Sequence, residues 1–362
     1  MTDASNTANS GRVPRLDEEP EKVKFVRTDA VQWEGPWDPD DYDPDAARAT
    51  MESYIDDAVE AERLGLDGQL MTEHHFDGWT MAPSPNVYLA ALAMRTSRLR
   101  LGQAVHVLPI HNPWRLAEET GMLDLLSNGR AEIGVGKGNF SVERMRYTPP
   151  GDEFDERFVE GLELLTRAMR ESNVTFDGRY TQIPIPATVY PRPYEPENLR
   201  VWCAGLRPES IAHIGRTGNN LYGFLTPDAP DNFKIYQDAA GEAGHERTGA
   251  NFMVIVSVII APTDAEAQRS QQQALDMAWD TMTARNFPQD EKEFYHPVFG
   301  GAIVGSPQTV LDQLAPAFEA TRSRRLNLVW RLRSMPFDVA RQTQHLFCTE
   351  VMPELQRLPV AG

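Results

Sequence analysis

Hydrophobic positions along the chain alternate between short β-rich runs and longer helical patterns. Met51, Ile55, Ala58 and Val59 recur at i, i+4, i+7 and i+8, so they share one helix face that ends near Gly65. Runs rich in β-branched residues predict strands between such helices. The predicted strands are 23–27, 68–72, 99–108, 131–135, 200–204, 220–225, 252–260 and 326–332. After the helix that ends near Gly65, the predicted helices are 85–96, 113–126, one from about 152, 208–215, 231–243, one from about 264, 307–319 and 337–351.

Eight strand-then-helix units favour a (β/α)₈ barrel, although the periodicity alone leaves a doubly wound open sheet as the alternative. Two segments interrupt the alternation. Residues 174–194 are proline-rich with an Asp177-Gly178 turn and predict a hairpin insertion, and the irregular residues 285–304 predict a second insertion. Residues 1–22 are polar and end in an acidic cluster, so we expect a mobile tail before a single domain over 23–362.

Charge and cysteine content narrow the classes of function. A net charge of −18 makes nucleic acid and membrane surfaces unfavourable partners, whereas a phosphate-bearing cofactor can still bind where basic residues or a helix N-terminus oppose that charge. Cys203 and Cys348 give neither a disulfide framework nor zinc-ligand spacing, so no metal site is expected. Residues 1–10 lack the features of a signal peptide, and we expect a cytoplasmic protein.

In a barrel, chemistry is expected where the strands end. The second predicted strand ends in Thr-Glu-His-His-Phe, residues 72–76. Adjacent residues of a strand point to opposite faces, so His74 and His75 can hardly bind one ion. An imidazole titrates near neutral pH and suits proton transfer, which leaves a solvated loop and a general acid or base as the two main interpretations.

Two further strand ends are chemically suggestive. Glycines alternate at 134, 136 and 138, which indicates either tight packing or the close approach of a flat ring or phosphate opposite Lys137. After the fifth strand, Pro208 suits the first turn of a helix, so Glu209 and Ser210 lie at its positive end. That end is either a structural cap or a phosphate site.

The sequence around these motifs strongly resembles bacterial luciferase and its flavin-dependent relatives. The resemblance rests on Thr-Glu-His-His-Phe at 72–76, Leu-Gly-Gln-Ala-Val-His-Val-Leu-Pro at 101–109, Ser-Asn-Gly-Arg at 127–130 and the glycines of 134–138, and it runs without gaps from about residue 70 to 139. It implies a barrel that binds reduced FMN, adds molecular oxygen at the flavin C4a position and passes oxygen to a small organic substrate.

The resemblance also implies roles for individual residues. His74 matches the catalytic histidine of the family. Lys137 stands where luciferases carry an arginine against the FMN phosphate, and a lysine keeps the charge but loses the bidentate fork. The remaining implied contacts are the backbone N–H of Asn139 and the helix-terminus residues Glu209 and Ser210 at the phosphate, and a non-proline cis peptide between Ala104 and Val105 against the flavin ring.

Departures from the luciferase pattern argue against light emission, because Gly136 replaces a thiol-bearing residue and His106 an apolar one. No Gly-x-Gly-x-x-Gly dinucleotide motif follows a strand, so the reduced FMN is expected from a separate flavin reductase. The leading expectation is a two-component monooxygenase that performs Baeyer–Villiger-type insertion or hydroxylation, as a homodimer paired through helices near the first barrel units. The alternatives are a deazaflavin-dependent hydride-transfer enzyme and a non-catalytic accessory subunit; the presence of His74, Lys137 and Ser210 argues against the accessory subunit.

Overall fold

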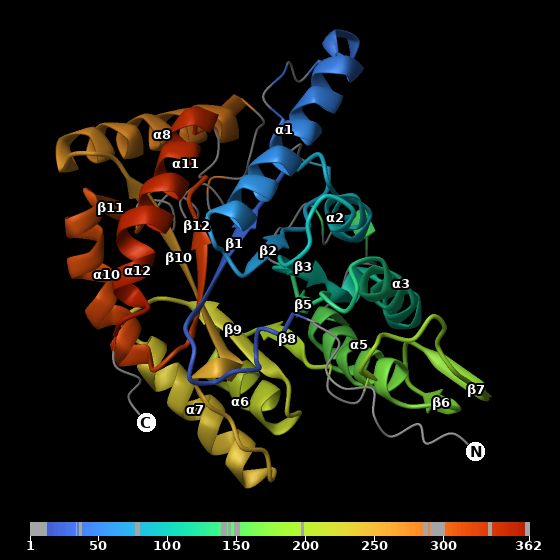
Figure 1. The fold of residues 1–362 in the computed structure, drawn as a ribbon. Helices are drawn as coiled ribbons and strands as arrows, with labels where there is room; N and C mark the ends of the chain where they lie inside the picture. The colour runs from blue at the N-terminus through green and yellow to red at the C-terminus, as the bar shows by residue number, and fades with distance from the viewer. Residues whose placement is uncertain are drawn as a thin grey trace, which may run out of the picture.

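Parallel strands form the centre of the molecule and helices surround them, as the computed structural model shows (Figure 1). The structure describes residues 13–33, 35, 38–76, 80–138, 143, 146–147, 153–196, 199–284, 289, 301–331 and 335–358. The barrel strands are β1 (Lys24–Asp29), β2 (Gly68–Met71), β3 (Arg100–Gln103), β4 (His106–Val107), β5 (Ile133–Gly136), β8 (Val201–Ala204), β9 (Asn220–Phe224), β10 (Phe252–Ile260) and β12 (Arg325–Val329).

The strands form a nearly closed parallel barrel, as expected. Their order is β3-β2-β1-β12-β10-β9-β8-β5-β4. Leu101 in β3 bridges Ala131, just before β5, while β4 pairs with the end of β5. β3 and β4 therefore form one interrupted barrel strand, which the sequence predicted as a continuous strand over 99–108. The cis peptide between Ala104 and Val105 separates its two parts.

Proline fixes the start of many surrounding helices, because its ring suits the first helical turn and the missing N–H is not needed there. Pro44, Pro85, Pro113, Pro208 and Pro307 each open a helix. The helices are α1 (Pro44–Arg63), α2 (Pro85–Ala93), α3 (Pro113–Leu126), α5 (Glu153–Arg170), α6 (Pro208–Arg216), α7 (Ala229–Glu242), α8 (Asp264–Ala284), α10 (Pro307–Thr321), α11 (Phe337–Leu346) and α12 (Met352–Leu355). The α-helix predicted over 337–351 ends at Leu346, and Phe347–Val351 continues it as a π-helical turn.

The first predicted insertion is a hairpin at the periphery of the barrel (Figure 1). β6 (Val174–Asp177) pairs antiparallel with β7 (Gln182–Ala187), and the N–H of Gly178 closes the turn onto the carbonyl of Thr181. Most of the second predicted insertion, 285–304, lies outside the described residues. Its end enters β11 (Ile303–Gly305), which pairs with β10.

The segment 13–22 is packed into the base of the barrel, which corrects the expectation of a mobile tail there. Leu16 is fully buried and joins Val26, Trp202 and Met253 in the core inside the barrel. The Arg325 guanidinium donates hydrogen bonds to the carbonyls of Leu16, Glu18 and Lys22. The polar composition of this segment therefore gave no indication that Leu16 is buried or that the segment's backbone carbonyls accept hydrogen bonds from the barrel. Residues 1–12 lie outside the described part of the chain.

Candidate functional site

The parallel barrel brings the predicted site residues to one rim. His74 follows β2, Lys137 directly follows β5, and Glu209 and Ser210 lie in the first turn of α6, just after β8. Because all these strands run in the same direction, their C-terminal ends meet at the same end of the barrel. Asn139, the other residue expected at the phosphate, lies outside the described residues.

One carboxylate joins two cations at the start of α6. Lys137 Nζ lies 2.7 Å from Asp155 Oδ1, and Arg207 Nη2 lies 3.1 Å from Asp155 Oδ2. The hydrogen bond from Lys137 and the nearby positive charges hold the pKa of Asp155 below its usual range. Arg207 is the N-cap residue of α6 and its side chain makes no capping hydrogen bond. Asp155 therefore links Lys137 to Arg207, the residue that precedes α6 and does not itself cap the helix.

The glycines of β5 are explained by packing against the neighbouring strand, one of the two interpretations left open by the sequence. A Cβ atom at Gly134 would overlap the carbonyl oxygen of Gln103. At Gly136 it would lie 2.6 Å from Cγ2 of Val105, the residue after the cis bond. The glycines of β5 thus leave space for the backbone and side chains of the interrupted β3–β4 strand.

His74 and His75 diverge, as expected for neighbours in an extended segment. Nδ1 of His74 lies 3.2 Å from Oε1 of Glu143, which also accepts the His75 backbone N–H at 2.7 Å. Glu143 is buried, and its Oε2 atom has no hydrogen-bond partner among the described residues. The His75 side chain turns instead to Glu73, with its Nε2 2.9 Å from Oε1.

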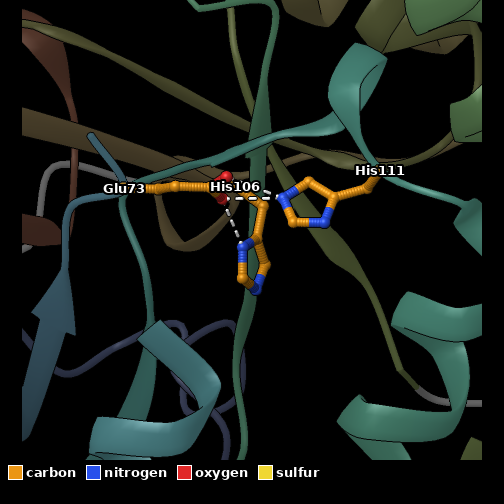
Figure 2. Close-up of side chains that lie close together, drawn as sticks. All are labelled: Glu73, His106 and His111. Carbon is orange, nitrogen blue, oxygen red and sulfur yellow. Dashed lines mark hydrogen bonds and ion pairs between the residues drawn. The ribbon is translucent and has the colours of Figure 1, made fainter. Parts of the chain in front are cut away.

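Glu73 is the centre of a buried group of imidazoles, here named the Glu73 cluster: Glu73, His75, His106 and His111. Figure 2 shows His106, from β4, and His111, from the loop before α3, both directed at the Glu73 carboxylate. His106 Nδ1 lies 2.7 Å from Oε2, and His111 Nε2 lies 2.7 Å from Oε1 and 2.9 Å from Oε2. The Glu73 side chain is 0% exposed, so the imidazoles take the place of the water molecules that would hydrate an exposed carboxylate.

The charges within the Glu73 cluster are shifted by burial and by one another. Burial opposes ionisation of Glu73, but hydrogen bonds from His106, His111 and His75 outweigh it and hold the pKa of Glu73 well below its usual value. Burial lowers the pKa of His106 despite the nearby carboxylate. Burial acts in the same direction on His111, yet Glu73 raises the pKa of His111 above its usual value. An ionised Glu73 thus faces imidazoles of unequal basicity.

Several residues at this rim had no role in the sequence-based expectations. Glu143 and Asp155 lie outside any motif, and their contacts with His74 and Lys137 depend on how the chain folds back over the rim. Arg207 directly precedes a predicted helix start, and a cation at that position could have been recognised in the sequence as a candidate anion contact. His111 lies within the luciferase-like block, but its contact with Glu73 could not be predicted because 38 residues separate the two.

Family membership follows from a match over most of the chain. The profile of the family described as "Luciferase-like monooxygenase" matches residues 37–324. The chain belongs to this family. Among the described residues of this luciferase-like protein, no helix is long and apolar enough to cross a membrane.

Relatives of this luciferase-like protein include flavin-dependent monooxygenases. The oxygenase component of flavin-dependent trigonelline monooxygenase from Acinetobacter baylyi is 26% identical over 333 residues, which cover 84% of this chain and 91% of that protein. The oxygenating constituent of 3,6-diketocamphane monooxygenase from Pseudomonas putida, a type II Baeyer–Villiger monooxygenase in complex with FMN, shares the fold with a TM-score of 0.75 at 20% identity, over 92% of this chain and 99% of that one.

A second group of relatives uses a different cofactor. The F420-dependent glucose-6-phosphate dehydrogenase from Kineococcus radiotolerans is 34% identical over 190 residues, which cover 49% of this chain and 54% of that protein. Both groups are oxidoreductases, and together they support an enzyme of that class.

Proposed function

We propose that this luciferase-like protein is the oxygenase component of a two-component monooxygenase. In this proposal it receives reduced FMN from a separate flavin reductase and oxidises a small organic substrate with molecular oxygen, by Baeyer–Villiger-type insertion or hydroxylation. The observation that carries the proposal is the meeting of Lys137 and Arg207 at the uncapped start of α6, on the rim where His74 lies.

The chemistry of these groups fits the phosphate of FMN. A helix N-terminus offers backbone N–H donors and a positive dipole end to an anion, and two cations within reach of one carboxylate add charge of the same sign. Ser210 is half-buried in the first turn of α6 and adds a hydroxyl, whereas Glu209 is exposed and offers its backbone N–H. We expect Lys137 and Arg207 to exchange Asp155 for the phosphate.

The proposal places the flavin ring against Ala104, Val105 and the side-chain-free end of β5 at Gly136. Reduced FMN, when bound, supplies the electrons that activate oxygen. The protein supplies a surface at the rim that orients the ring, and the strand positions of Val105 and Gly136 define one side of it.

His74 is the proposed proton-transfer residue at this rim. Its Nδ1 lies 3.2 Å from Oε1 of Glu143, so this carboxylate orients the ring and favours the tautomer with the proton on Nδ1. Which ring nitrogen carries the proton is set by such a partner. We assign Glu143 as a positioning residue that acts through His74.

A cofactor comparison tests the proposal. The full chain is titrated with chemically reduced FMN and with reduced F420, and oxygen consumption is then measured with ketones, aldehydes and N-heterocycles. We expect tighter binding of FMN than of F420 and substrate-dependent oxygen consumption. Tighter binding of F420, with hydride transfer and no oxygen use, would replace this proposal with the dehydrogenase function that the 34% identical relative brings into consideration.

A further inference from the structure

The proposed oxygenase reaction assigns no role to the Glu73 cluster. Three ligand-type atoms, one carboxylate oxygen of Glu73 and one ring nitrogen each of His106 and His111, lie within 4.8 Å of one another. They come from the end of β2, from β4 and from the loop before α3, so the fold itself assembles them (Figure 2). No metal site was predicted from the sequence, since only local ligand spacing was considered there, and 33 residues separate Glu73 from His106.

Neighbouring amides fix the orientation of the His106 ring. The Gly134 N–H donates to Oε1 of Gln103 at 3.3 Å, so Nε2 of Gln103 is left to donate to Oδ1 of Asn86 at 2.7 Å. Nδ2 of Asn86 in turn donates to Glu119 at 3.3 Å. Oδ1 of Asn86 is therefore an acceptor, and it lies 3.3 Å from Nε2 of His106, in a position to accept from that nitrogen when it carries the proton.

Two ring nitrogens converge on the same carboxylate. Nδ1 of His106 lies 2.7 Å from Oε2 of Glu73, and Nε2 of His111 lies 2.7 Å from Oε1. With the proton of His106 on Nε2, its Nδ1 lone pair is available to a cation held between the ring and the carboxylate. In the other tautomer Nδ1–H donates to Glu73 and no ion is needed, and the experiment below distinguishes the two.

We propose that Glu73, His106 and His111 bind one divalent transition-metal ion, with Zn²⁺ as the representative ion. Two imidazoles and a carboxylate are the ligand types of open zinc sites, in which water takes the fourth position. His106 would bind through Nδ1 while its other nitrogen donates to Asn86, the outer-shell contact that orients ligating histidines.

The surroundings of the cluster suit ion entry. The His111 side chain is 28% exposed, against 3% for His106, so solvent reaches the site from the His111 side. The hydrogen-bond distances of 2.7 Å would open slightly, because zinc lies about 2.0–2.1 Å from each ligand atom. This site is separate from the proposed phosphate contacts, and the inference does not rest on the proposed function.

Calorimetric titration of the full chain with Zn²⁺ tests the inference. The protein is first treated with a chelator and freed of flavin, so the result does not depend on the cofactor. We expect one Zn²⁺ per chain, at least tenfold weaker binding in His106→Ala and in His111→Ala, and unchanged binding in the control His345→Ala, which removes an exposed imidazole on α11. Affinity is expected to fall as the pH is lowered from 8 to 6, because Zn²⁺ and protons compete for the imidazole nitrogens.

A buried histidine can be needed for folding, so circular dichroism in chelator accompanies each variant. If His106→Ala does not fold, the partly exposed His111→Ala decides alone. X-ray absorption of the zinc-loaded chain is expected to show nitrogen and oxygen ligands at about 2.0–2.1 Å. The absence of stoichiometric Zn²⁺ binding, or equal binding by wild type and a folded His111→Ala, would overturn the metal site and leave a proton between His106 and Glu73.

Discussion

Lys137 Nζ lies 2.7 Å from Oδ1 of Asp155, at the end of the barrel where α6 begins. The second oxygen of the same carboxylate faces Arg207. One acidic side chain therefore forms ion pairs with the two cations that the proposed function assigns to a phosphate. Asp155 is 57% exposed, which leaves it free to swing away. An anion that binds here competes with Asp155 for Lys137 and Arg207.

The first prediction concerns this competition. Asp155→Asn is expected to tighten FMN binding about two- to fivefold, the range that an exposed ion pair of up to about 1 kcal/mol allows. Asp155→Glu, which keeps the charge, is the matched control. Fluorescence titration at low and high salt measures both, and the gain is expected to shrink as salt screens the charges. Weaker binding in Asp155→Asn would instead assign Asp155 to holding the two cations in place.

The second prediction concerns His74 and its partner. His74→Ala is expected to lower turnover at least tenfold with flavin still bound, within the range of general acid–base contributions. Glu143→Gln keeps the shape but no longer favours a proton on Nδ1, so a smaller loss and a shifted pH profile are expected. Turnover and flavin affinity are measured side by side, with His345→Ala as control. A Glu143→Gln enzyme with the wild-type pH profile would remove its positioning role.

The third prediction concerns pH and the Glu73 cluster. The lowered pKa of Glu73 means that its stabilising contribution is full above its unfolded pKa of about 4.3 and is lost as the pH falls through the folded value. The raised pKa of His111 adds stability that is full below about 6.5 and is lost as the pH rises through the folded value. The stability gap between wild type and Glu73→Gln is therefore expected to be largest between about pH 5 and 6.

Urea unfolding in chelator across pH 4 to 8 measures that gap. Its maximum is expected to be roughly 3–5 kcal/mol, the loss typical when a buried charged pair is broken. A gap that does not change with pH would show that Glu73 contributes through packing alone.

The fourth prediction concerns the base of the barrel. Leu16→Ala removes a fully buried side chain and is expected to lower the free energy of unfolding by about 2–5 kcal/mol. Leu206→Ala, at a position 51% exposed, is the matched control and is expected to change it by less than about 0.5 kcal/mol. Equal stability of the two variants in denaturant unfolding would contradict the packed position of residues 13–22.

The fifth prediction concerns the homodimer expected from the sequence. Exposed apolar side chains gather on neighbouring helices, with Val87 and Met94 at α2 and Met122 and Leu125 on α3. If the dimer pairs through these helices, Met94→Glu is expected to convert it to a monomer in light scattering after size exclusion. Ile185→Glu, an equally exposed apolar position on β7, is expected to keep the dimer. A wild-type monomer, or a dimer unaffected by Met94→Glu, would contradict this pairing.

Local pattern predicted the elements well where one physical cause decides them. The β-branched run 252–260 became β10 with the same bounds, and Pro208 and Pro307 opened the helices expected there. The prediction of one continuous strand over 99–108 was wrong, because no local sequence pattern indicates the interruption between β3 and β4. Only the family resemblance implied the cis peptide at that position.

The site was predicted less completely than the fold. His74, Lys137, Glu209 and Ser210 were placed at one rim by the topology of a parallel barrel, which the sequence pattern implied. Asp155 and Glu143 depend on long-range folding of segments without a motif.

The packing of Leu16 has a consequence for the order of binding in the proposed reaction. Leu16 lies among the core side chains inside the barrel, and its carbonyl accepts a hydrogen bond from Arg325 at the base, so the proposed cofactor and substrate are expected to enter from the opposite rim, where His74 and Lys137 lie. A substrate bound first at that rim would lie in the path of the larger flavin, so we expect the cofactor to bind before the substrate.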